Sequence, residues 1–363
     1  MTRQRNSVGD KASQIRAGKQ TCAAGAVERA ASTALTAPLV TVVVPAFNAE
    51  RTIGETLSSV RAQTYRNLEI IVVDDGSSDA TASIVEANAS EDERVRLIRQ
   101  DNSGVAAARN CGIRAAQGGF VAPVDADDLW RPTKIEKQMA EIFAGGPRCG
   151  LVYTWQARID ATGRILDQRP GPAYEGDVTP RLLYGNFLGS GSLALIRKEA
   201  LDEVGGYDSA LLAQQAQGCE DWKLYLEIAS RYRFGVVKEH LTGYRQGPGR
   251  MSTDRFQMLR SHELVRRWAL DRFPEHAPCI RKGFADYLLR TLVITSSRGN
   301  LRTALNIVGL LARRPTSTLG VLMWWPIIVS GVAARAARRA LVGPSSPADH
   351  SLQSDRARKF LQH

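Results

Sequence analysis

An acidic segment directly after an apolar run carries the residues of this chain that are best suited to chemistry. Asp125 and Asp127 follow the run that ends at Val124, with Ala126 between them. Alternate side chains of an extended segment point to one side, so the two carboxylates are expected to share a face. Carboxylate oxygens suit Mg²⁺ or Mn²⁺, and such an ion could neutralise the charge on a nucleoside-diphosphate leaving group. The competing interpretation is a solvated acidic turn without a ligand.

A second pair of carboxylates, Asp74 and Asp75, follows the apolar run 68–73. Carboxylates in this place can accept hydrogen bonds from the ribose or base of a nucleotide. Ser78 or Asp79 is expected only to cap the helix that starts after them. Asp74 and Asp75 are therefore the candidates for nucleotide binding in this segment.

The segment Asn102-Ser103-Gly104 leads into a helix of small residues that contains Arg109. Glycine and other small residues permit the close approach of another backbone, or of a ligand, to the start of a helix. Asn102, Gly104 and Arg109 are therefore further candidates for nucleotide binding. For Arg109, direct contact with phosphate and pairing with the acidic residues are equally weighted interpretations.

Two later segments could complete a reaction site. Glu220 and Asp221 precede a helix-like stretch, where a carboxylate could be the general base that takes a proton from an acceptor hydroxyl. A carboxylate at a helix N-terminus also stabilises the helix dipole, so a simple cap is the equally weighted alternative. Arg245 and the glycine-containing segment that continues through Ser252 could form a loop that closes on a diphosphate.

These segments need a scaffold that brings them together, and the hydrophobic pattern predicts one. Apolar runs alternate with helix-like stretches from Pro38 onward, which indicates an α/β fold with a mostly parallel sheet and helices on both faces. Ligands bind beyond the carboxyl ends of the strands in such sheets, so the acidic segments would lie on one rim. The predicted strands are 40–44, 68–73, 95–98, 120–124 and 193–196, and the predicted helices are 53–61, 80–88, 105–116, 134–143 and 221–230.

The composition excludes some classes of protein and leaves others open. With 44% hydrophobic and 23% charged residues, the chain of 363 can bury a substantial core, which excludes wholesale disorder. A net charge of +11 favours an acidic partner: nucleic acid, anionic lipid or a phosphate-bearing substrate. The five cysteines are widely spaced, and no apolar stretch follows the basic start of the chain. We therefore expect no disulfide framework and no secretory signal, and a reducing cytoplasm fits best.

The chain is expected to contain four regions. Residues 1–37 mix basic and small polar residues without apolar periodicity, which is typical of a disordered leader. The other regions are a catalytic domain at 38–255, with a nucleotide half at 38–150 and an acceptor half at 151–255, then a basic helical region at 256–342 and a flexible tail at 343–363.

Residues 316–334 raise the question of a membrane. They are uncharged, but Pro326 interrupts them and they barely reach the length of a bilayer-spanning helix. The arginines on both sides and two adjacent tryptophans suit an interfacial helix on anionic lipid, and contact of residues 303–342 with a membrane surface is one of two equally weighted interpretations. A helical hairpin packed on the catalytic domain or on a dimer partner is the alternative, and a single span is a minority option.

Five motifs taken together resemble family 2 glycosyltransferases of the GT-A fold, over roughly residues 39 to 252. In chain order they are Val43 to Asn48, Val72 to Asp79, Gly104 to Asn110, Val124 to Asp128 and Glu220 to Trp222. The resemblance implies an inverting, metal-dependent glycosyltransferase, in which a base deprotonates the acceptor while the metal-bound diphosphate departs. The QxxRW motif of processive synthases is missing, and so are two long channel-forming helices, which favours transfer of one sugar or a few.

The resemblance also implies roles for single residues. Pro45, Phe47 and Asn48 would line the nucleotide pocket, and Asp74 or Asp75 would hold the nucleobase and ribose. Asp127 would bind Mg²⁺ or Mn²⁺ with Asp125 nearby, and Asp221 would be the catalytic base. Arg245 and Ser252 would belong to a late loop that closes over the donor.

The implied substrates are a nucleotide-sugar donor, with UDP as the default nucleotide, and a saccharide or lipid-linked acceptor of cell-envelope or surface polysaccharide synthesis. No nucleic-acid motif accompanies the basic charge, so we expect no nucleic-acid partner and a site at the inner face of the cell membrane. The donor sugar, the acceptor and the oligomeric state stay open. The alternatives are a nucleotidyltransferase, whose glycine-rich, lysine-bearing phosphate loop is absent at 45–48, and a non-catalytic membrane-associated module that binds nucleotide sugars.

Overall fold

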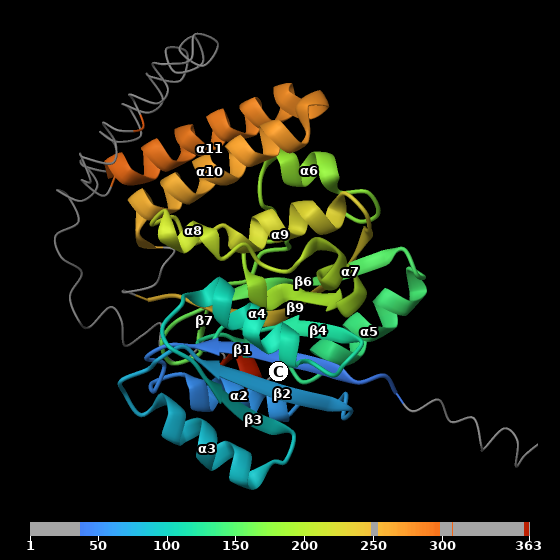
Figure 1. Ribbon diagram of the computed structural model, residues 1–363, viewed down its shortest axis with the longest axis vertical. Coiled ribbons are helices and arrows are strands. Elements are labelled where there is room, and N and C mark those ends of the chain that lie inside the picture. Colours follow the sequence, from blue (N-terminus) through green and yellow to red (C-terminus); the bar gives the residue numbers. More distant parts are fainter. Residues whose placement is uncertain (1–36, 248–252, 298–306, 308–358, 363) are drawn as a thin grey trace, which may run out of the picture. The chain divides into compact units, whose positions relative to one another are not determined.

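In the computed structural model, the described residues are 37–247, 253–297, 307 and 359–362 (Figure 1). The chain divides into two units at Pro38, and every helix and strand below belongs to the unit Leu39–His363. The leader predicted at residues 1–37 lies outside the described residues, apart from Ala37.

The first half of the sheet consists of parallel strands that alternate with helices. The strands are β1 (Val40–Ala46), β2 (Leu68–Asp74), β3 (Val95–Arg99) and β4 (Phe120–Pro123), and helices α2 (Ile53–Arg61), α3 (Thr81–Glu91) and α4 (Val105–Ala115) follow the first three. The strand order is β3-β2-β1-β4, with every pair parallel. The alternation of strands and helices predicted for this half is confirmed, and all the carboxyl ends lie at one edge.

The second half of the sheet departs from the mostly parallel arrangement that the sequence predicts. Its strands are β5 (Leu129–Trp130), β6 (Cys149–Ile159), β7 (Ile165–Asp167), β8 (Ala194–Arg197) and β9 (Arg233–Arg245). The order continues β4-β8-β6-β9-β5, and β8 is antiparallel to both of its neighbours, whereas β6 and β9 are parallel. Strand–helix alternation ends at β4, and β7 follows β6 through a tight turn, which can join only antiparallel strands. The sheet is therefore mixed.

Helices cover both faces of the sheet, as predicted. The remaining helices of this part are α5 (Lys134–Ala144), α6 (Thr179–Tyr184), α7 (Lys198–Val204), α8 (Ala210–Ala213) and α9 (Glu220–Ala229). Helices α2, α3 and α5 share a core with Val42 and Val44 of β1, whereas α4, α7 and α9 share the opposite core with Val43. Side chains alternate across β1, so this one strand anchors both cores.

Two long helices, α10 (Arg255–Arg272) and α11 (Ala277–Ser297), lie beside each other and over α9 (Figure 1). His262 of α10 packs between Trp222 of α9 and Tyr287 of α11, with ring centroids 4.4 and 3.8 Å away. Burial lowers the pKa of His262 to about 3, so the ring is neutral at physiological pH. The helical character predicted from residue 256 onward is confirmed up to Ser297.

The membrane question falls largely outside the described residues, because residues 303–342 are not among them except for Ile307. Within the described part of the chain, no helix is both long enough and apolar enough to cross a bilayer.

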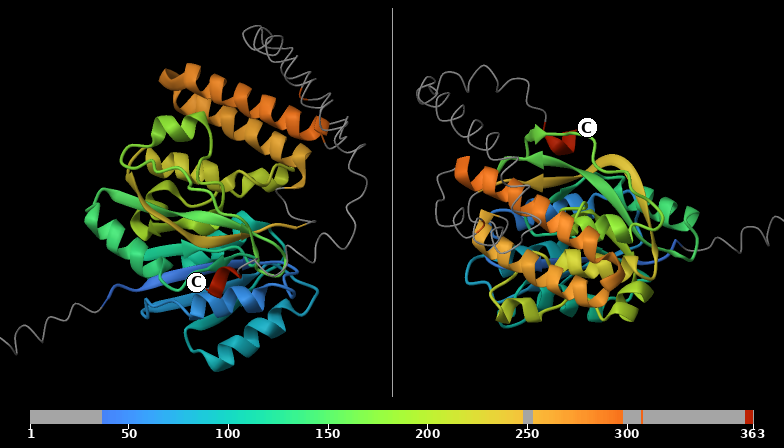
Figure 2. Two further views of the ribbon diagram at one scale, coloured as in Figure 1. Left: turned by 180° about the vertical axis from the view of Figure 1, so that it is seen from behind. Right: turned by 90° about the horizontal axis from the view of Figure 1, so that it is seen from above.

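Residues 359–362 differ from the flexible tail predicted for residues 343–363. They include a short 3-10 turn, η5 (Phe360–Gln362), that lies against the strands at one side of the sheet (Figure 2). The side chain of Phe360 is fully buried, and this burial is the physical reason for the difference.

Candidate functional site

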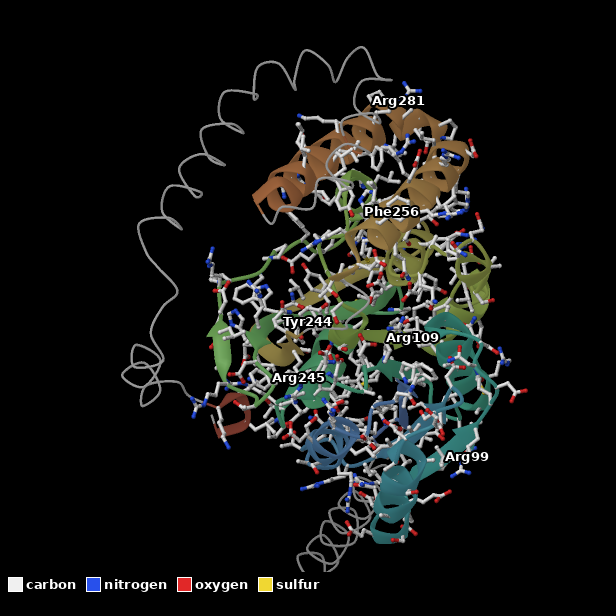
Figure 3. All side chains as sticks on the ribbon, turned by 90° about the vertical axis from the view of Figure 1, so that its left-hand side faces the viewer. Arg99, Arg109, Tyr244, Arg245, Phe256 and Arg281 are labelled. Carbon is white, nitrogen blue, oxygen red and sulfur yellow. The ribbon has the colours of Figure 1, made fainter. Side chains whose placement is uncertain are left out.

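A cleft of about 1040 Å³ opens at the carboxyl ends of β1 and β4, and the start of α9 and the end of β9 complete its wall. Arg109, Tyr244 and Arg245 all line this cleft, and they lie between Arg281 at the top of the view and Arg99 lower down (Figure 3). The predicted site residues that line the cleft are Pro45, Phe47, Asn48, Arg109, Asp125, Asp127, Glu220, Asp221 and Arg245. The structure thus brings most of the candidates together on the predicted rim.

The Asp125–Asp128 segment is a turn and not the extended segment that the sequence predicts. Its backbone closes through a hydrogen bond of 3.0 Å from the Asp128 amide to the Asp125 carbonyl. The buried Asp128 carboxylate fixes the turn, because it accepts hydrogen bonds from the Ser192 hydroxyl at 2.7 Å and from the Arg245 amide at 3.1 Å. Asp125 and Asp127 nevertheless both line the cleft, so the turn achieves what the extended geometry was expected to provide.

Arg109 is buried between two carboxylates. Its Nη2 donates to Asp125 at 2.6 Å and its Nη1 donates to Glu220 at 3.0 Å, and the guanidinium lies over the Tyr207 ring at 5.1 Å. Burial disfavours the charged guanidinium, but the adjacent carboxylates outweigh it and hold the pKa of Arg109 well above its ordinary value. The sequence left two interpretations of Arg109, contact with phosphate and pairing with acidic residues. In the structure, Arg109 pairs with the acidic residues Asp125 and Glu220.

Asp221, at the start of α9, is the carboxyl group whose environment best suits proton transfer. One of its oxygens accepts the Trp222 amide at 2.6 Å, and within the described part of the chain it forms no ion pair. Burial and the neighbouring charge of Glu220 raise the pKa of Asp221 to about 7. A general base works best when its pKa lies near the operating pH, so Asp221 is poised to accept a proton.

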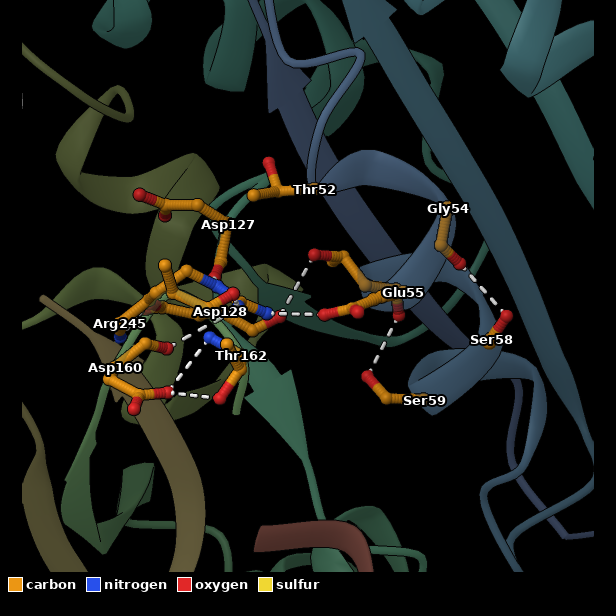
Figure 4. A network of polar contacts seen from close by, with 12 residues as sticks. Thr52, Gly54, Glu55, Ser58, Ser59, Asp127, Asp128, Asp160, Thr162 and Arg245 are labelled. Atoms are coloured by element: carbon orange, nitrogen blue, oxygen red, sulfur yellow. Dashed lines mark hydrogen bonds and ion pairs between the residues drawn. The ribbon is translucent and has the colours of Figure 1, made fainter. Parts of the chain in front are cut away.

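Arg245 holds the other side of the Asp125–Asp128 turn, which we call the acidic turn. It does so mainly through hydrogen bonds to backbone carbonyls (Figure 4). Its Nε donates to the Asp127 carbonyl at 2.8 Å and its Nη1 donates to the Ala161 carbonyl at 2.6 Å. Its Nη2 pairs with Glu55 at 2.7 Å. The guanidinium is thus already bonded on several sides, while the neighbouring Tyr244 and Gly247 also line the cleft.

The loop after β1 forms the outer wall of the cleft. Phe47 is 51% exposed there, which is unusual for an aromatic ring and leaves a face available for stacking. Asn48 has a positive φ of 49°, a conformation that asparagine tolerates better than most residues. Its side-chain oxygen accepts a hydrogen bond from the backbone amide of Ser78 at 2.9 Å, and its own backbone amide donates to the Ser77 hydroxyl at 2.9 Å. Asn48 therefore ties the loop after β1 to the loop after β2.

Several predicted site residues do not line the cleft. The carboxylate of Asp75 accepts hydrogen bonds from Gln100, from the Ser103 amide and from the Gly104 amide, so it organises the entry to α4. Gly104 has φ +84°, and a Cβ there would come within 3.0 Å of Leu212. Asp74 lines a separate hollow, Asn102 lines neither the cleft nor this hollow, and Ser252 lies outside the described residues.

Other cleft residues were not among the predicted ones. Arg51, which lies just beyond Asn48, lines the cleft, and so do Gly189, Ser190, Gly191 and Met258 of α10. The run Gly189-Ser190-Gly191-Ser192 is a signal that the sequence offered, because small residues permit close approach of a ligand. Met258 gave no such signal, since its place in the wall depends on how α10 packs.

The residues of the acidic turn fit a metal ion that is coordinated partly by substrate phosphates better than an ion that protein side chains hold alone. In the described part of the chain, no group of three or more His, Cys, Asp or Glu side chains could hold an ion alone. Mg²⁺ is commonly bound by one or two carboxylates together with substrate phosphates and water. Asp127 has its backbone carbonyl held by Arg245 while its side chain extends away from Arg245 (Figure 4). The turn therefore suits an ion that a diphosphate helps to coordinate.

Comparison with known proteins identifies relatives of this chain. The family model described as Glycosyl transferase family 2 matches residues 41–205. An uncharacterized glycosyltransferase of Haemophilus influenzae is 46% identical over 216 residues, covering 57% of this chain and 65% of the relative. A Bacillus subtilis glycosyltransferase, TuaG, named for teichuronic acid biosynthesis, is 38% identical over 132 residues, covering 36% of this chain and 52% of the relative. Among four other curated relatives, the match spans only 28% to 40% of the relative's length.

Solved structures share the fold at low sequence identity. TarS of S. aureus, in complex with UDP-GlcNAc, has a TM-score of 0.56 at 20% identity, covering 74% of this chain and 79% of that one. The mannosyltransferase PcManGT of Pyrobaculum calidifontis, in complex with GDP-Man and Mn²⁺, has a TM-score of 0.53 at 21% identity, covering 84% and 88%. The mixed sheet with flanking helices is therefore of the GT-A type, and the predicted fold class is confirmed.

Proposed function

Because residues 41–205 belong to glycosyl transferase family 2, we propose that the protein transfers a sugar from a nucleoside-diphosphate sugar to an acceptor hydroxyl, with inversion at the anomeric carbon. The observation that carries this proposal is the shared cleft, in which the acidic turn and Asp221 face one space. A volume of about 1040 Å³ is enough for a nucleotide sugar together with part of an acceptor.

The donor would lie along the edge of β1 and β4. The exposed ring of Phe47 would stack on the nucleobase, and the diphosphate would lie against Asp127 and the bound ion. When bound, Mg²⁺ or Mn²⁺ would neutralise the charge that develops on the departing nucleoside diphosphate. The UDP-GlcNAc complex of TarS and the GDP-Man complex of PcManGT support a nucleotide-sugar donor of this kind.

Asp221 would deprotonate the acceptor. Its carboxylate takes the proton of the acceptor hydroxyl as that oxygen bonds to the anomeric carbon, and the bond from this carbon to the diphosphate oxygen breaks. Arg109 would not react, but it would hold Asp125 and Glu220 so that the acidic turn and the base keep a fixed relation. Direct displacement of this type gives the inverted product.

The acceptor belongs to a less defined class. A relative named for teichuronic acid biosynthesis supports a saccharide or lipid-linked acceptor of cell-envelope polysaccharide synthesis. The absence of a QxxRW motif from the sequence supports transfer of one sugar or a few. Peripheral contact with a membrane through residues 303–342 is also proposed, and sedimentation with anionic vesicles would test it.

Asp221→Asn separates binding from turnover. The variant should bind UDP and Mn²⁺ as the wild type does but lose transfer by about 10²-fold or more, because general bases typically contribute this much. Calorimetric titration measures binding, and product analysis of a UDP-sugar panel measures transfer. Unchanged turnover would show that Asp221 is not the base.

Asp127→Asn tests the metal. It should abolish Mn²⁺-dependent binding of UDP while the fold remains intact, as judged by thermal unfolding without ligand. Full transfer in the presence of EDTA would rule out the metal role, and release of pyrophosphate in place of nucleoside diphosphate would point to nucleotidyl transfer.

A further inference from the structure

A small apolar pocket beside β5, the strand that directly follows the acidic turn, is filled by Phe360, a residue more than 200 positions later in the sequence. The ring of Phe360 is fully buried there in one cluster with Leu129, Ala157 and Ile159. The guanidinium of Arg131 lies 4.9 Å from the centre of the ring. Burial of an aromatic ring together with a cation–π contact is a specific anchor and not a loose surface contact.

Backbone pairing adds to this anchor. Lys359 forms an antiparallel bridge with Arg164, and the Phe360 amide donates to the Gly163 carbonyl at 2.9 Å. The segment Lys359–Gln362 is therefore recognised through its main chain as well as through one ring. Main-chain pairing with alternate side chains in pockets is how extended peptides bind to the edge of a sheet.

The pocket has room for the ring because β9 carries a glycine at this point. A Cβ on Gly243 would lie 2.9 Å from the Phe360 ring and 3.1 Å from Ile159. An alanine there would need part of the space that the ring occupies. Gly243 lies two residues before Arg245 on the same strand, so the pocket and the cleft share β9.

The elements around Phe360 are the ones that hold the acidic turn. Gly163, which accepts the Phe360 amide, closes the turn whose Asp160 and Ala161 carbonyls accept hydrogen bonds from Arg245. Leu129, which belongs to the same buried cluster as Phe360, directly follows Asp128. Docking of Phe360 therefore supports both the turn after β6, through Gly163, and the turn after β4, through Leu129.

We infer that the pocket is a docking site for this chain's own segment Lys359–Gln362, and that Phe360 is a positioning residue for the donor site. The inference rests on the proposed function for the identity of the ligand and on contacts of the described residues for the mechanism. Docking holds the Asp160–Gly163 turn, this turn holds Arg245, and Arg245 holds the backbone of Asp127. Release of the segment loosens the site for metal and diphosphate without removing any group that touches them.

The test compares three variants of the full chain. Phe360→Ala removes the anchor, Gly243→Ala fills the space of the ring, and Leu361→Ala changes the adjacent side chain, which is 43% exposed, as a matched control. The probe is UDP with Mn²⁺, measured by calorimetry. Phe360→Ala and Gly243→Ala should each weaken binding of the probe about three- to tenfold, with less than a twofold change in kcat at saturating donor, whereas Leu361→Ala should match the wild type.

Hydrogen exchange supplies a readout that does not depend on any ligand. Amides of residues 127–131 and 160–165 should exchange faster in Phe360→Ala and Gly243→Ala, while those of α2 and α3 stay unchanged. A peptide Lys-Phe-Leu-Gln added in excess should restore slow exchange to Phe360→Ala but not to Gly243→Ala. Phe360→Leu keeps an apolar side chain, so its UDP binding and its amide exchange should both be close to those of the wild type. This result would separate loss of docking from failure to fold.

Several outcomes would overturn the inference. Unchanged exchange in Phe360→Ala would show that the segment supports nothing, and faster exchange over the whole sheet would show general destabilisation only. Dimers in the wild type that dissociate in Phe360→Ala would assign the segment to a second copy. If the wild type binds no UDP but the exchange changes appear as expected, the proposed donor fails while the docking site stands.

Discussion

The acidic turn is held by one buried arginine on each side, and the two arginines bind different kinds of partner. Arg109 is 5% exposed and pairs with the carboxylates of Asp125 and Glu220. Arg245 is 6% exposed and bonds to the carbonyls of Asp127 and Ala161, with Glu55 as its carboxylate partner. One side of the turn is thus a network of charges, and the other side is mainly a network of backbone hydrogen bonds.

This difference indicates what each side does. A buried charge network responds strongly to the loss of any one charge, because the remaining charges are left without compensation. It also connects the turn to Glu220, the neighbour of Asp221, so the Arg109 side links the proposed metal site to the proposed base. Neutral carbonyls near solvent lose less when a donor is removed, so the Arg245 side sets the shape of the turn more than its charge.

The largest expected effect comes from Arg109→Met. The substitution leaves Asp125 and Glu220 partly buried without their cation, and the free energy of unfolding should fall by about 3–5 kcal/mol. Transfer should also be lost, because the acidic turn and the base lose their connection. Urea unfolding and a transfer assay at low temperature, where the variant is still folded, measure the two effects.

Arg109→Lys is the control for this prediction. Lysine keeps the charge but cannot donate to two carboxylates from a fixed planar group, so it should recover part of the stability and little of the activity. Wild-type stability in Arg109→Met would mean that the two carboxylates are protonated or solvated, and the contrast between the two arginines would then disappear.

A smaller effect concerns pH and Asp221. Its pKa is raised to about 7 in the folded protein from an ordinary value of 3.8, so the unfolded chain loses this proton first. The free energy of unfolding should therefore decline as pH rises from about 4 to 7, and the whole of this decrease is present above pH 7. Asp221→Asn stays neutral, so its free energy of unfolding should exceed that of the wild type at pH 8 and equal it at pH 4. Thermal or urea unfolding at the two pH values measures the difference.

The same group should give the opposite trend in activity. With Asp221 as the proposed base, transfer requires its deprotonated carboxylate, so the rate should rise as pH passes through about 7 while stability falls. A rate that stays constant between pH 5 and 8 would indicate that another group accepts the proton or that a later step limits turnover.

The parallel half of the fold could be predicted from the sequence because its signals are local. Alternation of apolar runs and helix-like stretches defined β1 to β4, and the bounds of α2 agree with the prediction at both ends. The acidic residues after the strands then fell on one rim by the geometry of parallel sheets. These inferences need only the residues near each segment.

The partners of the two arginines could not be predicted in this way. Arg109 meets Glu220 across 111 positions of sequence, and the Arg245 amide meets the Asp128 carboxylate across 117. The first contact depends on how α9 packs beside α4, and the second depends on the long β9 of the mixed half of the sheet. A sequence shows that an arginine is near acidic residues, but only the packing shows that its charge is already used.

The smallest expected effect comes from Glu55→Gln, and it completes the comparison. Glu55 is 56% exposed, so its pair with Arg245 is screened by water and should contribute less than about 1 kcal/mol to stability. The carbonyls of Asp127 and Ala161 still hold the guanidinium in the variant, so UDP binding with Mn²⁺ should change less than twofold. Asp125→Asn, which neutralises the equivalent partner on the Arg109 side, should weaken the same binding by a larger factor. If the two neutralised variants lost equal affinity, the Arg245 side would also act through charge, and the guanidinium would then be a direct diphosphate ligand in the closed complex.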